Sequence, residues 1–167
     1  TRKLVEQEKV LCLFNTLGTA NNTAIHKYMN QKKVPQLFVA TGATKWADPE
    51  RFPWTMGWQP SYRSEAAVYA RLIMRDQPQG KVGVLYQNDD FGKDLLNGLK
   101  EGLGANAGLA ATAGVPMYAS LGEMLAKDRP DGVLLATPNQ LHADQAIECI
   151  AAGVAVFVEK PVAHTLA

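Results

Sequence analysis

Short apolar runs alternate with helical patterns along this 167-residue chain, and this alternation restricts the fold more than any other feature. Several runs are apolar without alternation, which is typical of parallel strands buried on both faces. The expected strands are Val10–Asn15, Gln36–Ala40, Lys81–Gln87, Val115–Ala119, Gly132–Thr137 and Val154–Glu159. The expected helices are Lys3–Glu8, Asn22–Gln31, Ser61–Asp76, Gly92–Leu103, Leu121–Asp128 and His142–Ala152. The sequence therefore predicts an α/β fold with a doubly wound, mostly parallel sheet of about six strands and helices on both faces.

The overall composition excludes several classes of partner. Apolar residues make up 47% of the chain and charged residues 20%, with a net charge of +1, which is the balance of a soluble globular protein. Without an excess of Lys and Arg we expect no nucleic-acid or membrane surface. No apolar run approaches the roughly 20 residues of a membrane span, and the polar start at Thr1–Lys3 predicts no signal peptide. The cellular compartment stays open.

The cysteines and histidines do not form a ligand pattern. Cys12 and Cys149 each lie within an apolar run, so we expect small buried side chains and not a disulfide or a metal pair. His26, His142 and His164 are scattered without the spacing of a zinc site. We therefore expect no metal.

Two stretches interrupt the alternation. Residues Thr41 to Pro60 contain three Trp and three Pro residues with little periodicity, and an irregular segment of this length needs cover in a compact domain. We expect self-association either through unpaired strand edges or through the Trp46–Trp58 segment. The second stretch, residues 102–114, is rich in Ala and Gly and has no strand pattern. It is the expected junction between two parts of the chain.

Three ordered motifs in residues 1–103 carry a resemblance to a known family. They are Val10–Thr19, Val34–Thr44 and Lys81–Gly92, and together they resemble type I periplasmic binding proteins of the branched-chain amino-acid transporter receptor kind. In that family two lobes close on a small ligand, and turns after the strands bind the ligand's carboxylate. The ligand-binding positions that this resemblance implies here are Thr16 to Thr19, above all Thr19, with Gly42, Thr44 and Phe91. The alternative is that these threonines only cap helices and turns.

Residues 105–167 resemble a different family. The motif Thr137-Pro138-Asn139 with His142, followed by Glu159-Lys160-Pro161, resembles the dinucleotide-binding domain of the Gfo/Idh/MocA oxidoreductases. The resemblance implies that Thr137, Pro138, Asn139, His142 and Glu159 line a nicotinamide cofactor and that Lys160 is the catalytic lysine. The alternatives are a solvated lysine at a strand end and a histidine with a structural polar partner.

The sequence lacks a glycine-rich turn between a strand and a helix, which is the element that would bind the pyrophosphate of a dinucleotide. The glycines Gly102, Gly104 and Gly108 follow a helical pattern and not a strand, and their spacing is one residue too long. The turn Gln87–Gly92 joins a strand to a helix, but two carboxylates replace the glycines that let a phosphate approach. We therefore expect no bound cofactor and no enzyme activity.

These observations predict a chimera in which residues 1–103 and 105–167 merge into a single α/β domain over residues 1–167. We expect a Rossmann-like or flavodoxin-like sheet in which Lys81–Gln87 replaces the missing first strand of the dehydrogenase. The leading hypothesis is an engineered or recombined scaffold without evolved activity. Two alternatives stay open: a residual NAD(P)-dependent oxidoreductase, and a fragment that binds an amino acid or aromatic acid.

Overall fold

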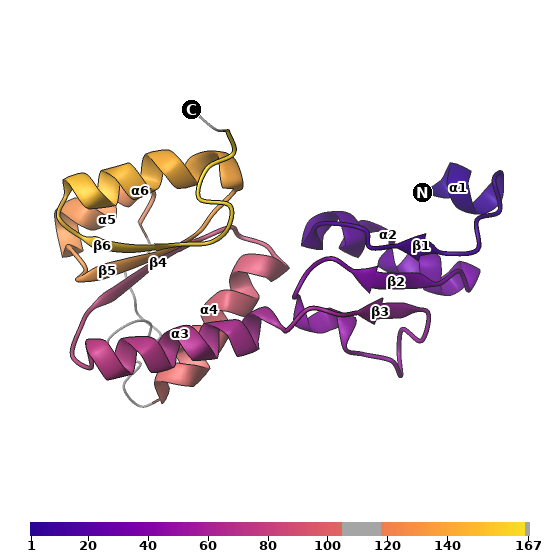
Figure 1. Ribbon diagram of the computed structural model, residues 1–167, viewed down its shortest axis with the longest axis horizontal. Coiled ribbons are helices and arrows are strands. Elements are labelled where there is room, and N and C mark those ends of the chain that lie inside the picture. Colours follow the sequence, from indigo (N-terminus) through magenta and orange to yellow (C-terminus); the bar gives the residue numbers. More distant parts are fainter. Residues whose placement is uncertain (105–117, 166–167) are drawn as a thin grey trace.

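The strands form two separate three-stranded sheets, with helices packed around each of them (Figure 1). The computed structural model describes residues 1–104 and 118–165. Its strands are β1 (Leu13–Phe14), β2 (Gln36–Val39), β3 (Thr55–Gly57), β4 (Val82–Tyr86), β5 (Gly132–Ala136) and β6 (Ala155–Val158). Its α-helices are α1 (Arg2–Glu6), α2 (Thr19–Lys32), α3 (Tyr62–Asp76), α4 (Asp90–Leu103), α5 (Leu121–Asp128) and α6 (His142–Ala151). The predicted α/β class is confirmed. Five of the six predicted strand ranges each contain an observed strand, and β3 was not predicted.

The N-terminal sheet is parallel, in the order β1-β2-β3. Met29 of α2 and Val39 of β2 are fully buried. The buried side chain of Gln36 donates a hydrogen bond of 2.7 Å to Asn22, which satisfies both polar groups away from water. Strand β1 is shorter than the expected Val10–Asn15, and Asn15, the residue after it, has a φ of 54° in the left-handed region.

The C-terminal sheet has the parallel order β4-β5-β6 and is covered on both faces. Figure 1 shows α3 and α4 on one side and α5 and α6 on the other. Alternate residues of β5 point to opposite faces of the sheet. Leu134 and Ala136 belong to the apolar cluster with α3 and α4, and Val133 and Leu135 belong to the cluster with α5 and α6. This double cover explains why β5 is apolar throughout.

Strand β4 pairs in register with β5, from Val82 opposite Gly132 to Tyr86 opposite Ala136, as expected for the strand Lys81–Gln87. The merger of two segments of different origin stays a prediction. The expected single sheet of about six strands is wrong, because β1, β2 and β3 form a sheet of their own. After β3 the chain continues into the long helix α3, which packs in the second lobe, so the next strand starts a new sheet (Figure 1).

Helices α3 and α4 approach each other closely because α4 has two glycines on the contact face. A Cβ atom at Gly98 would lie 2.5 Å from the backbone oxygen of Arg63, and one at Gly102 would lie 2.6 Å from the Cβ of Ala70. The apolar cluster around these helices also includes Val39 and Trp46 of the N-terminal lobe. One core therefore connects the two lobes through this helix pair.

The irregular stretch from Thr41 to Pro60 contains structure that the sequence did not predict. The 3-10 turn η1 (Thr44–Trp46) and the short strand β3 both lie in it. Trp46 is buried, whereas Trp54 is 37% and Trp58 61% exposed. Trp46 is therefore a core residue, and self-association through the rest of this segment stays a prediction.

The expected junction spans residues 102–114, and the structure describes only its first three residues. The expected strand Val115–Ala119 also falls largely outside it, and the described residues 118 and 119 are not in a strand. A second 3-10 turn, η3 (Asn139–Leu141), precedes α6. Within the described residues, no helix is both long enough and apolar enough to cross a membrane.

Candidate functional site

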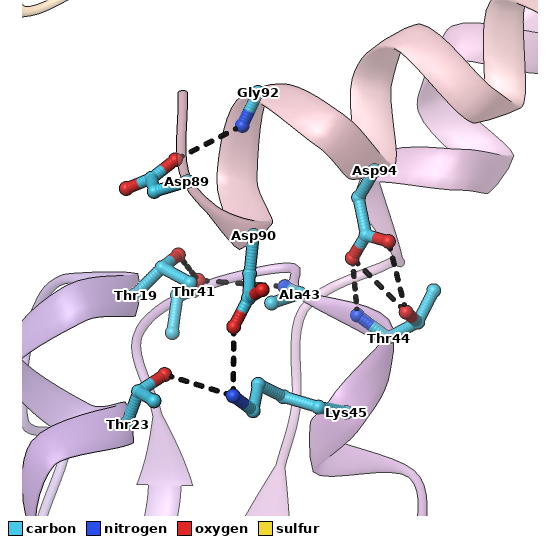
Figure 2. A network of polar contacts seen from close by, with 10 residues as sticks. All are labelled: Thr19, Thr23, Thr41, Ala43, Thr44, Lys45, Asp89, Asp90, Gly92 and Asp94. Atoms are coloured by element: carbon cyan, nitrogen blue, oxygen red, sulfur yellow. Dashed lines mark hydrogen bonds and ion pairs between the residues drawn. The ribbon is translucent and has the colours of Figure 1, made fainter. Parts of the chain in front are cut away.

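The ends of β1 and β2 face the start of α4 across a cleft between the two lobes (Figure 2). A cavity of about 320 Å³ lies here, between the first turns of α2 and the acidic start of α4. Thr19 and Thr23 line one side, and Asp89 and Asp90 line the other. Carboxyl ends of parallel strands are where ligands bind in open α/β sheets, so this position is the first candidate for a site.

The carboxylate of Asp94 accepts hydrogen bonds from the backbone amide and the hydroxyl of Thr44. The backbone N–H of Thr44 donates to Oδ2 of Asp94 at 2.7 Å, and the Thr44 hydroxyl lies 3.0 Å from both carboxylate oxygens (Figure 2). Asp94 lies on α4, so these contacts connect the two lobes. The geometry shows that Thr44, one of the predicted ligand positions, presents an amide and a hydroxyl suited to a carboxylate.

A second contact across the cleft involves the only cation of this network. Lys45 Nζ lies 2.7 Å from Asp90 Oδ2 and 3.1 Å from the hydroxyl of Thr23 (Figure 2). The side chains of Lys45 and Asp90 are 31% and 51% exposed, so water screens the ion pair and its net contribution is about 0–1 kcal/mol. Lys45 is therefore free to exchange partners at low energetic cost.

The other predicted ligand positions are used within the fold. The hydroxyl of Thr19 lies 2.5 Å from that of Thr41, and both residues are buried. Gly42 lies against the chain between the lobes, because a Cβ there would approach the backbone oxygen of Pro60 to 2.6 Å. Phe91 packs edge-on against Tyr62 at 4.8 Å. Only Thr44 of the four predicted positions contacts a carboxylate group.

The dehydrogenase-like motifs come together at the ends of β5 and β6. His142 is buried, with Nδ1 at 2.7 Å from the carbonyl oxygen of Pro161 and Nε2 at 2.8 Å from that of Thr137. The Thr137 hydroxyl lies 2.6 Å from Oε1 of Gln145. His142 thus joins the two motifs through structural hydrogen bonds. Pro138 is half-buried and Asn139 is exposed.

Glu159 and Lys160 have opposite environments. Glu159 is 4% exposed, and its burial raises the pKa of its carboxyl group, an effect that the nearby Lys160 partly offsets and Glu65 reinforces. The Lys160 side chain is 80% exposed, and its ammonium lies 3.8 Å from Glu159. A lysine in this position is solvated. No hydrogen bond or ion pair among the described residues joins this group to Thr44 or Lys45.

The turn between β4 and α4 does not fit a dinucleotide. A pyrophosphate would lie at this helix start and accept backbone N–H donors. Here the Asp89 side chain accepts from the Gly92 N–H at 3.2 Å and from Gln87 at 2.5 Å. The carboxylates of Asp89 and Asp90 also repel a pyrophosphate. No hydride-transfer step can be derived from these residues.

Asp94, Lys45 and Asp90 were not predicted as site residues. Asp94 stands 50 positions after its partner Thr44, and no local pattern marks a pair so far apart. The sequence did show Asp90 as an acid in the first turn of a helix, which is common at helix starts and so carried no functional signal.

The described fold is that of periplasmic binding proteins. A leucine-binding protein from Thermotoga maritima matches 93% of this chain with a TM-score of 0.74 at 15% identity, and this chain covers 45% of it. A solute-binding protein from Rhodopseudomonas palustris BisB5, solved with 3,4-dihydroxybenzoic acid, matches 96% of this chain with a TM-score of 0.72 at 19% identity, and 46% of it is covered. These similarities support the fold alone.

The sequence of the second half matches a different family. Residues 77–167 match the GFO_IDH_MocA model, described as an oxidoreductase family with an NAD-binding Rossmann fold. A 4-carboxy-2-hydroxymuconate-6-semialdehyde dehydrogenase from Sphingobium is 53% identical over 47 residues, 28% of this chain and 15% of the relative. An uncharacterized oxidoreductase from Streptococcus pneumoniae is 34% identical over 94 residues, 50% of this chain and 24% of the relative. The chain thus spans at most about a quarter of these two relatives.

Both predicted resemblances are therefore confirmed: the resemblance to binding proteins as a similarity of fold, and the resemblance to the oxidoreductases as a family match. The first lobe and the order of elements are like those of binding proteins, and the family match covers more than half of the sequence. By its residues 77–167, this chain belongs to the Gfo/Idh/MocA oxidoreductase family.

Proposed function

We propose that the chain binds a small organic carboxylate in the cleft between its lobes and does not catalyse a reaction there. The observation that carries this proposal is the contact of the Thr44 amide and hydroxyl with the carboxylate of Asp94. A ligand carboxylate placed at Thr44 would receive the same hydrogen bonds. Asp94 then acts as an internal stand-in that keeps these donors satisfied until a ligand replaces it.

The surrounding charges support exchange of one carboxylate for another. When a ligand replaces Asp94, the Asp94 side chain moves toward solvent, and Lys45 can swing from Asp90 toward the ligand because its present ion pair is partly exposed. The cavity of about 320 Å³ is lined by residues of α2 together with Asp89 and Asp90, not by Thr44 or Asp94, and its volume lies at the small end of the usual range for ligand sites. A single-ring or branched aliphatic acid fits this size.

The neighbouring structures suggest which acids to use as probes. Two Rhodopseudomonas palustris solute-binding proteins were solved with 3,4-dihydroxybenzoic acid and with benzoate. A branched-chain amino acid transporter protein from Thermus thermophilus was solved with valine. We therefore include both aromatic acids and branched-chain amino acids among the ligands to be tested.

Isothermal titration calorimetry of the full chain tests this proposal directly. Benzoate, 3,4-dihydroxybenzoate, valine and leucine are titrated into the unchanged chain, into Thr44→Val and into the matched surface control Thr1→Val. We expect saturable heat with at least one acid, weakened about tenfold in Thr44→Val by loss of a charge-assisted hydrogen bond and unchanged in Thr1→Val. Absence of saturable heat with all four acids would contradict the proposal.

A second candidate function is NAD(P)-dependent oxidation or reduction, favoured by the family match over residues 77–167. When bound, a nicotinamide cofactor would supply hydride transfer. Against this candidate, Lys160 is exposed and the start of α4 carries two carboxylates. Titration of NADH with fluorescence detection separates the two functions, since saturable enhancement that Lys160→Ala or Asp89→Gly alters would favour the oxidoreductase.

We also infer that the two segments were joined by recombination, whether designed or natural. This inference is supported by two comparisons that differ: the family match covers residues 77–167 only, whereas the fold of the described chain is that of periplasmic binding proteins. A comparison of natural sequences tests it: natural proteins that match residues 1–76 and 77–167 together, in one continuous chain, would contradict the inference.

A further inference from the structure

The N-terminal lobe contains a second cavity, separate from the Thr44–Asp94 contact. It has a volume of about 350 Å³ and lies between helix α2 and residues 45–52, which connect η1 to β3. His26 and Lys27 of α2 line one side, and Lys45, Arg51 and Phe52 line the other. The two cavities share only Thr23, and neither Thr44 nor Asp94 lines either of them.

His26 is the buried polar group of this cavity. The residue is 4% exposed, and its Nε2 atom has no hydrogen-bond partner among the described residues. Its ring stacks on Phe52 with a centroid distance of 3.9 Å and meets Trp46 edge-on at 5.0 Å. The indole nitrogen of Trp46 is also buried without a partner. Buried polar atoms of this kind are rare in folded proteins, and each calls for a partner that the protein itself does not supply.

The protonation state of His26 favours a ligand that accepts a hydrogen bond. Burial lowers the pKa of His26, and the nearby charge of Lys45 lowers it further, while Asp48 partly offsets both. The ring is therefore neutral at neutral pH and has one N–H to donate.

The rim of the cavity has an excess of positive charge. Lys27, Lys45 and Arg51 provide three cations against the single carboxylate of Asp48. Arg51 pairs with Asp48 at 2.5 Å and Lys45 with Asp90 at 2.7 Å, whereas Lys27 forms no ion pair with any residue that the structure describes. The charge of Lys27 is therefore not compensated by a carboxylate, and Lys27 lines the same cavity as the buried His26. This combination recognises an anion.

From this arrangement we infer a second binding site, in which a small oxyanion, a carboxylate or a phosphate, binds between His26, Lys27 and Arg51 in the N-terminal lobe. The anion accepts a hydrogen bond from the His26 ring and is attracted by Lys27 and Arg51. The inference does not rest on the proposed cleft function, because no hydrogen bond or ion pair among the described residues joins these three residues to Thr44 or Asp94.

Nuclear magnetic resonance of the full chain provides the test, with the ring ¹⁵N signals of His26 as the readout at the site. Inorganic phosphate and benzoate are titrated separately at constant ionic strength. We expect a saturable shift of the His26 ring signals with at least one of the two. A shift with phosphate alone identifies an inorganic or phosphoryl anion, and a shift with benzoate alone identifies a carboxylate.

Three variants separate binding from general effects of charge. Lys27→Ala removes the unpaired cation from an exposed position and should weaken binding about threefold, as expected for a solvent-screened charge. Lys3→Ala removes an exposed cation far along the chain and should leave the affinity unchanged. Thr44→Val impairs the cleft only, so the His26 signals should still titrate. If neither anion gives a saturable shift, or if Lys27→Ala and Lys3→Ala bind equally well, the site is not an anion site and its buried nitrogen is satisfied by water.

Discussion

The carboxylate of Asp94 accepts hydrogen bonds from both the backbone N–H and the hydroxyl of Thr44, with the N–H contact at 2.7 Å. The two residues are 50 positions apart and lie in different lobes. The contact joins the two lobes and at the same time uses the donors that a ligand carboxylate would need. Ligand binding and lobe contact are therefore expected to compete.

A double-mutant cycle measures the strength of this contact. Asp94→Asn, Thr44→Val and the double variant are compared by urea unfolding, and we expect a coupling free energy of about 1–2 kcal/mol, since hydrogen bonds to charged groups exceed neutral ones. The same cycle on Lys45→Ala and Asp90→Ala should give less than about 1 kcal/mol, because that pair is partly exposed. Equal coupling in the two cycles would show that Asp94 has no special role.

The substitution Gly98→Ala tests the contact between α3 and α4, and Gly122→Ala in another helix is its control. Gly98→Ala places a methyl group 2.5 Å from the backbone oxygen of Arg63, which cannot move away without shifting α3, so we expect a loss of about 2–4 kcal/mol of unfolding free energy. Gly122→Ala in α5 meets only the carboxylate oxygen of Glu148, at 3.0 Å, on a flexible side chain. We expect that variant to gain up to about 1 kcal/mol from helix propensity.

The buried carboxyl of Glu159 makes the stability depend on pH. Burial raises the pKa of Glu159 above its ordinary value of 4.5, so the folded chain holds this proton more tightly than the unfolded chain. The resulting stabilisation is complete below pH 4.5 and is lost as the pH rises through the folded pKa. Glu159→Gln keeps the neutral shape, so its free energy of unfolding relative to the unchanged chain should rise between pH 4 and pH 8.

The control for this measurement is Glu50→Gln, which changes an exposed carboxylate. The pH dependence that belongs to Glu159 is the part of the Glu159→Gln difference that this control does not show. If the Glu159→Gln difference varies with pH no more than the control does, the carboxyl is hydrated in solution and the pH dependence does not originate at this residue.

The two lobes are expected to unfold together, as a single merged domain would. All three tryptophans lie in the N-terminal lobe, and Cys149 is fully buried in the C-terminal lobe, so each lobe has its own probe. In a Cys12→Ser background, the urea midpoint from Trp fluorescence should coincide with that from Cys149 labelling, because one apolar cluster spans both lobes. Separate midpoints would show two independent units.

The sequence predicted the elements of this fold better than their arrangement. β5, for example, is apolar throughout because both its faces are buried, and that property is visible in the sequence. The three-residue strand β3 has no such signal, since Thr55–Gly57 lies among tryptophans and prolines. The division into two sheets depends on where α3 packs, which is decided by contacts far apart in the chain.

The site was predictable only in part for the same reason. Thr44 was predicted because it stands in a motif after a strand; the structure places it in contact with Asp94 of the other lobe, and its role as a ligand position stays a prediction. Phe91 stands in a motif too, but its ring packs against Tyr62 in the core. The partners that decide what Thr44 does, Asp94 and the cation next to it, come from other elements and become neighbours only in the folded chain.

The most direct test of the central claim is the amide signal of Thr44 in a ¹H–¹⁵N spectrum during titration with a carboxylate that gives heat in the calorimeter. The account predicts that this signal shifts and saturates together with the heat, and that Asp94→Asn binds the acid more tightly because the internal competitor has lost its charge. A Thr44 amide that does not move while the ligand saturates, or weaker binding in Asp94→Asn, would contradict the account.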